Sequence, residues 1–143
     1  MHATKRVRWG AAIGGALAAE VILIVAAFAW VALYSYAIHP GETAAFYQRY
    51  AERASPWVSL TAGVPVFYLI CRWIGSRHPA QAWPTAMGVF GVYLALDLTL
   101  VLVAGGSPSL SMWLLLAGNY LGKLLGCHLG GTGAERSPHA IAA

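Results

Sequence analysis

Charged residues are scarce in this sequence. Only 10% of its 143 residues are charged, and 59% are hydrophobic, whereas a soluble domain carries about 25% charged residues. Tryptophan and glycine, both frequent in membrane helices, are by contrast well represented, with six and sixteen copies. The composition therefore argues against an ordinary soluble domain and indicates a membrane protein.

Cysteine is scarce as well. Cys71 and Cys127 are the two cysteines, too few for a disulfide scaffold. His78 and His128 follow close behind them in the chain, but the spacing matches no zinc pattern, and isolated membrane cysteines usually pack as small apolar residues. The histidines fall at predicted helix ends, in loops or in tails, so none can hold haem between helices. We therefore expect no metal and no cofactor.

Long apolar runs, by contrast, fill most of the chain. Each is long enough for a helix of about 20 residues to cross a bilayer. The fold class that they predict is an all-α, integral membrane four-helix bundle, forming a single transmembrane domain over 1–143. The expected spans cover about 9–38, 55–73, 82–104 and 109–129, with a flexible tail over 130–143.

The segment between the first two runs is more polar. Phe46, Tyr47 and Tyr50 recur there at helical spacing among charged residues, a pattern typical of an amphipathic helix in the membrane interface. The second run contains Pro65, which predicts a kink, since proline removes a backbone donor from a helix.

The basic residues favour one orientation. Arg49 and Arg53 fall on one side of the predicted membrane, and seven basic residues fall on or toward the other. The seven are Lys5, Arg6, Arg8, Arg72, Arg77, Lys123 and Arg136. Cytoplasmic segments carry the excess of Lys and Arg. We therefore expect a protein of the bacterial cytoplasmic membrane with both termini in the cytoplasm. The net charge of +4 then reflects orientation, and we expect no nucleic acid partner.

The tryptophans supply a depth scale, because all six fall near predicted span ends and tryptophan concentrates at membrane interfaces. Trp9 and Trp30 are separated by about 31 Å of helix, close to the hydrocarbon thickness of about 30 Å. On this scale Glu20 and Lys123 lie at the same depth, near the midplane.

Asp97 and Asn119 share a second depth, nearer the opposite interface. We therefore predict the pairs Glu20–Lys123 and Asp97–Asn119 as proton, ion or polar sites within the membrane. A charge at the bilayer centre costs about 2.5–3.5 kcal/mol, and two acids exceed one base, so one carboxyl should be neutral, exchange protons, or face a cation or water. Asp97 is the better candidate for the neutral form. The alternative is that these groups only join helices by hydrogen bonds.

Glycine recurs at every fourth position of the last run. Gly118, Gly122, Gly126 and Gly130 share one narrow helix face, which lets a neighbouring backbone approach closely. The face predicts tight packing, either within the bundle or between two copies of the chain.

The first run contains a local resemblance. The eight residues Gly14–Val21, Gly-Gly-Ala-Leu-Ala-Ala-Glu-Val, resemble the first-helix motif of small multidrug resistance transporters. The resemblance implies a dimer of four-helix chains in which Glu20 binds protons and cationic substrates. The chain departs from that family in the long segment after its first run, and Asp97 and Lys123 have no counterpart there.

Three classes of function stay open. The first is a small proton-linked transporter or channel-like protein that uses Glu20 and Asp97, with Lys123 as counter-ion. The second is a non-catalytic membrane subunit or assembly protein, whose partner is a second copy or another membrane protein. An enzyme is least favoured, because no nucleophile–base pair, metal pattern or phosphate loop appears.

Overall fold

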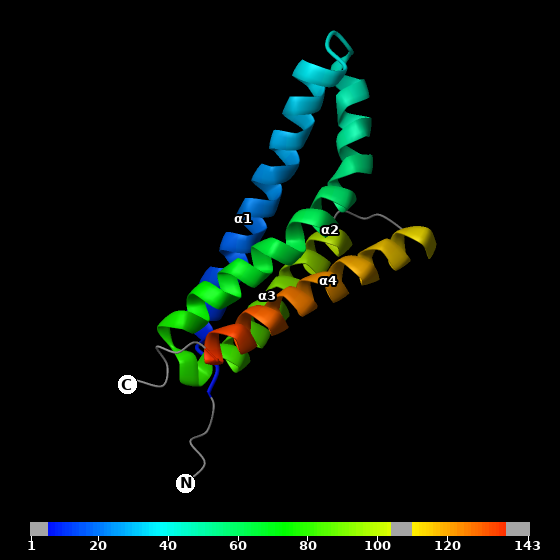
Figure 1. The fold of residues 1–143 in the computed structure, drawn as a ribbon. Coiled ribbons are helices and arrows are strands. Elements are labelled where there is room, and N and C mark those ends of the chain that lie inside the picture. Colours follow the sequence, from blue (N-terminus) through cyan, green and yellow to red (C-terminus); the bar gives the residue numbers. More distant parts are fainter. Residues whose placement is uncertain (1–5, 104–109, 137–143) are drawn as a thin grey trace.

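The computed structural model describes residues 6–103 and 110–136. These ranges contain α-helices and no strand. The α-helices are α1 (Trp9–Leu33), α2 (Ala44–Arg77), α3 (Ala82–Val103) and α4 (Leu110–Glu135), while η1 (Tyr34–Ile38) is a π-helical extension of α1 and η2 (Pro79–Gln81) is a short 3-10 helix before α3 (Figure 1).

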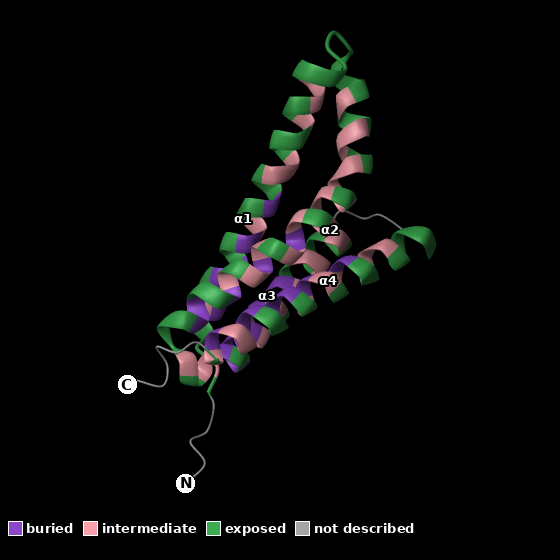
Figure 2. Ribbon diagram, in the orientation of Figure 1, coloured by how far each residue is buried: buried purple, intermediate pink, exposed green. Residues whose placement is uncertain are grey.

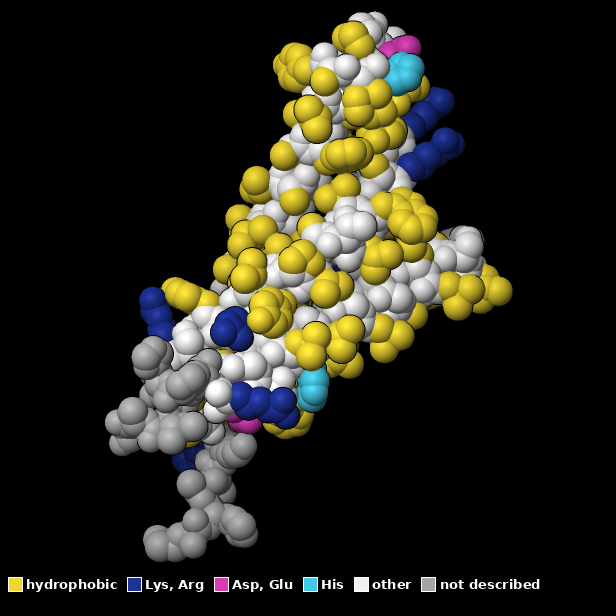
Figure 3. Space-filling view, viewed as in Figure 1, with side chains coloured by type: hydrophobic (Ala, Val, Ile, Leu, Met, Phe, Trp, Pro, Cys, Tyr) yellow, Lys and Arg dark blue, Asp and Glu magenta, His cyan; other side chains and the backbone are white. Residues whose placement is uncertain are grey.

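Three segments are long and apolar enough to cross a membrane, namely Trp9–Ile38, Ala44–Arg77 and Pro79–Val103. Large apolar side chains cover much of the visible face (Figure 3), and Phe28 and Leu102 are 73% and 76% exposed. Such a surface is unfavourable in water and suits hydrocarbon. The predicted all-α membrane bundle is thereby confirmed, although α4 is not among these three segments.

The bundle is closed at one end and open at the other. The closed end comprises the start of α1, the end of α2, the start of α3 and the end of α4 (Figure 1). There the Arg8 backbone N–H donates to Thr85 Oγ1 at 3.3 Å, and a Cβ added to Gly75 would lie 2.6 Å from the Cβ of Ala134. Buried residues concentrate toward this end (Figure 2), whereas η1 and the start of α2 diverge from α3 and α4.

Small residues make the closed end tight. Ala12, Ala16 and Ala19 are fully buried on α1 at the spacing that places side chains on one helix face. Between them, a Cβ at Gly15 would lie 2.7 Å from Ile74 Cδ1 on α2 and 3.1 Å from Val89 Cγ2 on α3. Close approach of this kind is how helices associate in a membrane.

The second helix begins earlier than the sequence predicted. A separate interfacial helix was expected before a span starting at about residue 55, but α2 runs unbroken from Ala44. Thr43 caps it, its hydroxyl accepting from the Phe46 N–H at 3.4 Å, which satisfies a backbone donor of the first turn. Pro56 and Pro65 both lie inside α2, and the helix changes direction along its length (Figure 1).

The fourth helix also extends further than expected. The flexible tail was predicted to start at residue 130, but α4 remains helical to Glu135. The reason is packing, since a Cβ at Gly131 would lie 2.9 Å from the Cβ of Ala86 on α3. The rest of the predicted tail, the boundary between the third and fourth predicted spans, and Lys5 lie outside the described residues.

Candidate functional site

A fully buried ammonium group lies at the centre of the bundle. Lys123 on α4 has no exposed surface, and its methylene stem crosses Gly63 on α2, where an added Cβ would lie 2.8 Å from Lys123 Cε. Its Nζ donates to Ser59 Oγ at 2.9 Å and to Tyr93 Oη at 2.6 Å, and lies 4.5 Å from the Tyr93 ring centroid. Hydroxyls from α2 and α3 thus replace water around the charge.

Asp97 has a different partner from the one that its depth suggested. The Tyr120 hydroxyl donates to Asp97 Oδ2 at 2.6 Å. Asn119, the residue before Tyr120, instead donates from Nδ2 to Ser59 Oγ at 3.3 Å, and its buried Oδ1 has no hydrogen-bond partner among the described residues. The expected Asp97–Asn119 pair is therefore replaced by an Asp97–Tyr120 pair.

Glu20 and Lys123 do not form the direct pair that their shared depth suggested. The Lys123 ammonium is held by two hydroxyls, and the carboxyl groups of Asp97 and Glu20 act on it through space, Asp97 more strongly than Glu20. The structure thus groups Glu20, Asp97 and Lys123 into one electrostatic cluster, with Tyr93 also interacting with both acids.

Both acids line a cavity of about 340 Å³ between α1, α2 and α3. Ser59 and Tyr93, the two residues that hold Lys123, line it as well. The rest of the wall is mainly apolar, contributed by Leu23, Ile24, Ala27, Phe28, Val31, Ala51 and Ser55. A cavity of this size, mostly apolar with a few convergent polar groups, is typical of small-ligand sites.

The charges around the cavity do not balance. Glu20 and Asp97 can carry two negative charges, and Lys123 supplies one positive charge. One negative charge is left over whenever all three groups are ionised, and in a low-dielectric surrounding it must be neutralised. A proton on one carboxyl or a cation in the cavity would do so, and this is the chemistry that the site allows.

The glycine face of α4 packs mainly against α2 of the same chain. An added Cβ would lie 2.6 Å from the Val64 carbonyl oxygen at Gly126, and 2.5 Å from the Tyr68 carbonyl oxygen at Gly130. At Gly122 it would lie 3.1 Å from Val64 Cγ2, whereas at Gly118 it would meet nothing within 4 Å among the residues that the structure describes. Packing within the bundle therefore accounts for three of the four positions.

The two cysteines, distant in sequence, are neighbours. Cys71 Sγ on α2 and Cys127 Sγ on α4 lie 3.3 Å apart, both buried and both free thiols. His128 points to another partner, its Nδ1 accepting from Trp83 Nε1 at 3.2 Å. Within residues 6–103 and 110–136, no group of three or more His, Cys, Asp or Glu side chains is arranged to hold a metal ion.

Sequence reasoning missed the hydroxyl residues of the site. A signal for Tyr93 was present, because it lies ten residues from Trp83, about 15 Å along the helix and so at the depth of Lys123. Tyr120 is three residues before Lys123, a spacing that places the two on one side of a helix. Ser59 offered no comparable signal.

The chain matches no protein-family model, no curated protein and no solved structure. The likeness of Gly14–Val21 to small multidrug resistance transporters thus remains local. The fold and the site define a class, a helical membrane bundle with a cavity that two carboxyl groups line, here called the carboxylate cavity.

Proposed function

We propose that this chain is a small proton-linked transporter or channel-like protein in which Glu20 and Asp97 bind the transported proton or cation. The observation that carries the proposal is the cavity of about 340 Å³ that both residues line. A charged acid inside a membrane is unfavourable by about 2.5–3.5 kcal/mol, so two acids beside one cavity are difficult to explain by packing alone.

Lys123 acts in this proposal as a fixed counter-charge. It is fully buried, and it reaches the cavity only through Ser59 and Tyr93. A positive charge held in place by these two hydroxyls stabilises one of the two carboxylates and leaves the other to exchange its proton or cation. The transported species would therefore bind at the carboxyls and leave the ammonium in place.

The proposal includes a topology. We place α4 (Leu110–Glu135) in the membrane as a fourth span and both termini in the cytoplasm, in a bacterial cytoplasmic membrane. Support comes from the distribution of basic side chains, which gather near the two ends of the bundle and leave an apolar zone between them (Figure 3). The closed end then faces the cytoplasm, and the divergent ends of α1 and α2 face outward.

Purified protein in liposomes that contain a pH-sensitive dye tests the transport activity. A pH step across the membrane should cause a proton flux, or a pH-dependent cation flux, that Glu20→Gln abolishes and Asp97→Asn strongly reduces. Glu52→Gln is the matched control, because Glu52 is an exposed acid on α2 outside the cavity lining. Absence of flux with every cation tested between about pH 5 and 9 would refute the proposal, provided that the protein remains folded.

A non-catalytic subunit is the second candidate, and the outer half of α4 favours it. Leu110 and Leu114 are 77% and 68% exposed, and a Cβ added at Gly118 would meet no atom of residues 6–103 and 110–136 within 4 Å. A helix of a second copy or of another membrane protein could pack there. Stable co-purification with such a partner, together with absence of flux, would favour this reading. We propose no enzymatic activity.

A further inference from the structure

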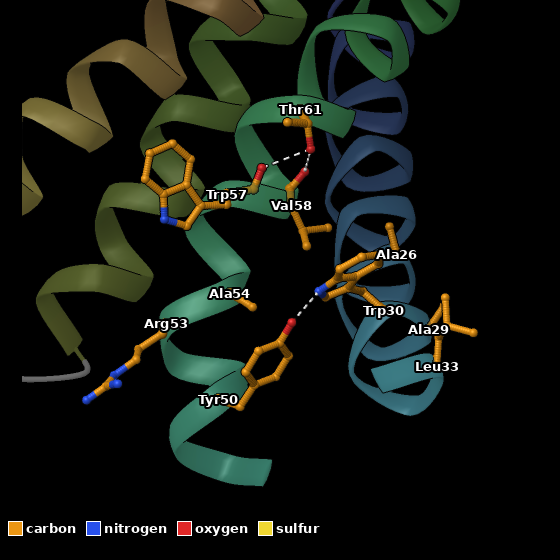
Figure 4. Close-up of a pocket in the computed structure, with 10 residues that line it drawn as sticks. All are labelled: Ala26, Ala29, Trp30, Leu33, Tyr50, Arg53, Ala54, Trp57, Val58 and Thr61. Carbon is orange, nitrogen blue, oxygen red and sulfur yellow. Dashed lines mark hydrogen bonds between the residues drawn. The ribbon is translucent and has the colours of Figure 1, made fainter. Parts of the chain in front are cut away.

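A second hollow lies between α1 and α2, nearer the open end and separate from the carboxylate cavity. This groove has a volume of about 930 Å³ and is shown in Figure 4. Its lining residues are Ala26, Ala29, Trp30, Leu33, Tyr50, Arg53, Ala54, Trp57, Val58 and Thr61. The alanines from both helices explain the hollow, because each leaves space that a larger side chain would fill.

An aromatic contact holds the two walls of the groove at a fixed separation. Trp30 Nε1 on α1 donates to Tyr50 Oη on α2 at 3.0 Å, and the Tyr50 ring stacks on Tyr34 with centroids 3.6 Å apart. Figure 4 shows the Trp30–Tyr50 hydrogen bond joining the helices. The groove is therefore formed before any ligand enters, which reduces the entropic cost of binding.

The polar groups of the groove are concentrated toward one end. Arg53 is exposed at its edge, one helical turn from Tyr50, and is the one charged residue among those that line it. Thr61 at the other end (Figure 4) is occupied, since its hydroxyl donates to the Trp57 carbonyl oxygen at 2.9 Å. A ligand would thus meet a cation at one end and apolar walls beyond it.

This polarity matches the chemistry of a lipid. Trp30, Tyr50 and Trp57 are the residue types that mark the membrane–water interface, so Arg53 would lie at the level of the headgroups. Guanidinium binds phosphate oxygens through charge-assisted hydrogen bonds. From Arg53 to Thr61 the helix rises about 12 Å, a length over which an acyl chain can lie against the alanines.

We propose that this groove binds one anionic phospholipid, with its phosphate at Arg53 and the first part of one acyl chain between α1 and α2. The site is independent of the carboxylate cavity, and its occupant would join the two helices where they diverge from the rest of the bundle. Arg49 lies one turn away on the same exposed side of α2 and does not line the groove. It would contribute only long-range electrostatic attraction to the lipid phosphate.

The test uses the full chain reconstituted in vesicles of equal phosphatidylglycerol and phosphatidylcholine with identical acyl chains. After extraction in mild detergent, native mass spectrometry measures the lipid that stays bound. The wild type should retain phosphatidylglycerol in preference to phosphatidylcholine by about tenfold, as expected for one charge-assisted contact. Arg53→Gln should abolish the preference, and Arg49→Gln, with the same change of charge, should keep most of it.

A second pair of variants tests the apolar part of the groove. Ala29→Leu would fill the groove and should reduce retention of both lipids. Ala32→Leu, at an exposed position of α1 outside the groove lining, should not change it. Equal effects of Arg53→Gln and Arg49→Gln, unchanged retention in Ala29→Leu, or displacement of the lipid by millimolar inorganic phosphate alone would each overturn the proposal.

Discussion

The thiol groups of Cys71 and Cys127 lie 3.3 Å apart across the contact between α2 and α4. The glycines on either side of Cys127 make this approach possible, because at Gly130 an added Cβ would lie only 3.0 Å from the Cβ of Cys71. A disulfide needs the sulfurs at about 2.05 Å, so they are about 1.3 Å from bonding distance.

We therefore predict that these two thiols form an intramolecular disulfide under an added oxidant, copper phenanthroline with dissolved oxygen. Each pair of thiols gives up two protons and two electrons to the oxidant, and the closed loop should raise the free energy of unfolding by about 2–4 kcal/mol. Alkylation after denaturation, followed by mass spectrometry, measures the product. Cys71→Ser is the control and should leave Cys127 alkylatable. Two reactive thiols in the oxidised wild type would contradict the prediction.

The glycine face should show a sharp difference between its two ends. Gly126→Ala would place a Cβ 2.6 Å from the Val64 carbonyl oxygen and should destabilise the bundle by about 1–3 kcal/mol, as overpacking does. Gly118→Ala would meet nothing within 4 Å and should stabilise α4 by up to about 1 kcal/mol through helix propensity. Unfolding in detergent compares the two. Equal stability of both variants would show that the α2–α4 contact is looser than described.

The electrostatic cluster predicts an order of coupling energies. In double-mutant cycles, Lys123→Met with Asp97→Asn should show a larger coupling than Lys123→Met with Glu20→Gln, because Asp97 acts more strongly on the ammonium. Residues that share one polar network couple by about 0.5–3 kcal/mol. The free energy of unfolding of each single and double variant supplies the measurement. Strictly additive effects in both cycles would mean that the acids and Lys123 do not interact.

The topology can be tested by labelling. In a chain with Cys71→Ala and Cys127→Ala, a cysteine introduced at Thr43 should react with an impermeant thiol reagent in intact cells, because our topology places the start of α2 outside. A cysteine introduced at Ser76, near the closed end, should react only after the cells are opened. The opposite result would invert the orientation that the basic residues predict.

The sequence predicts depths relative to a membrane, because tryptophan positions and a fixed helical rise supply a scale. The scale predicts one depth for Glu20 and Lys123 and a second depth for Asp97, whereas the structure groups these three residues in one electrostatic cluster. The four-helix class also followed from the lengths of the apolar runs.

Direct contacts could not be predicted, because they depend on how each helix is rotated about its axis. Asn119 and Tyr120 differ by one residue and thus by about 100° around α4. Because of this rotation, Tyr120 forms the hydrogen bond with Asp97, and Asn119 forms one with Ser59. The predicted ends of two helices were also wrong. A separate interfacial helix before residue 55 and a flexible tail from residue 130 were predicted, but capping and packing keep both segments in continuous helices.

The tightness of the closed end has a consequence for its thermodynamics. Alanine and glycine lose almost no side-chain entropy when they are buried, so burying Ala12, Ala16 and Gly126 in the closed half of the bundle has little side-chain entropic cost. The open end presents longer side chains such as Phe28 and Leu33, which are exposed and keep much of their rotamer freedom. Amide hydrogen exchange should therefore be slowest at the closed end and faster toward η1, where the helices can separate while the opposite end stays packed.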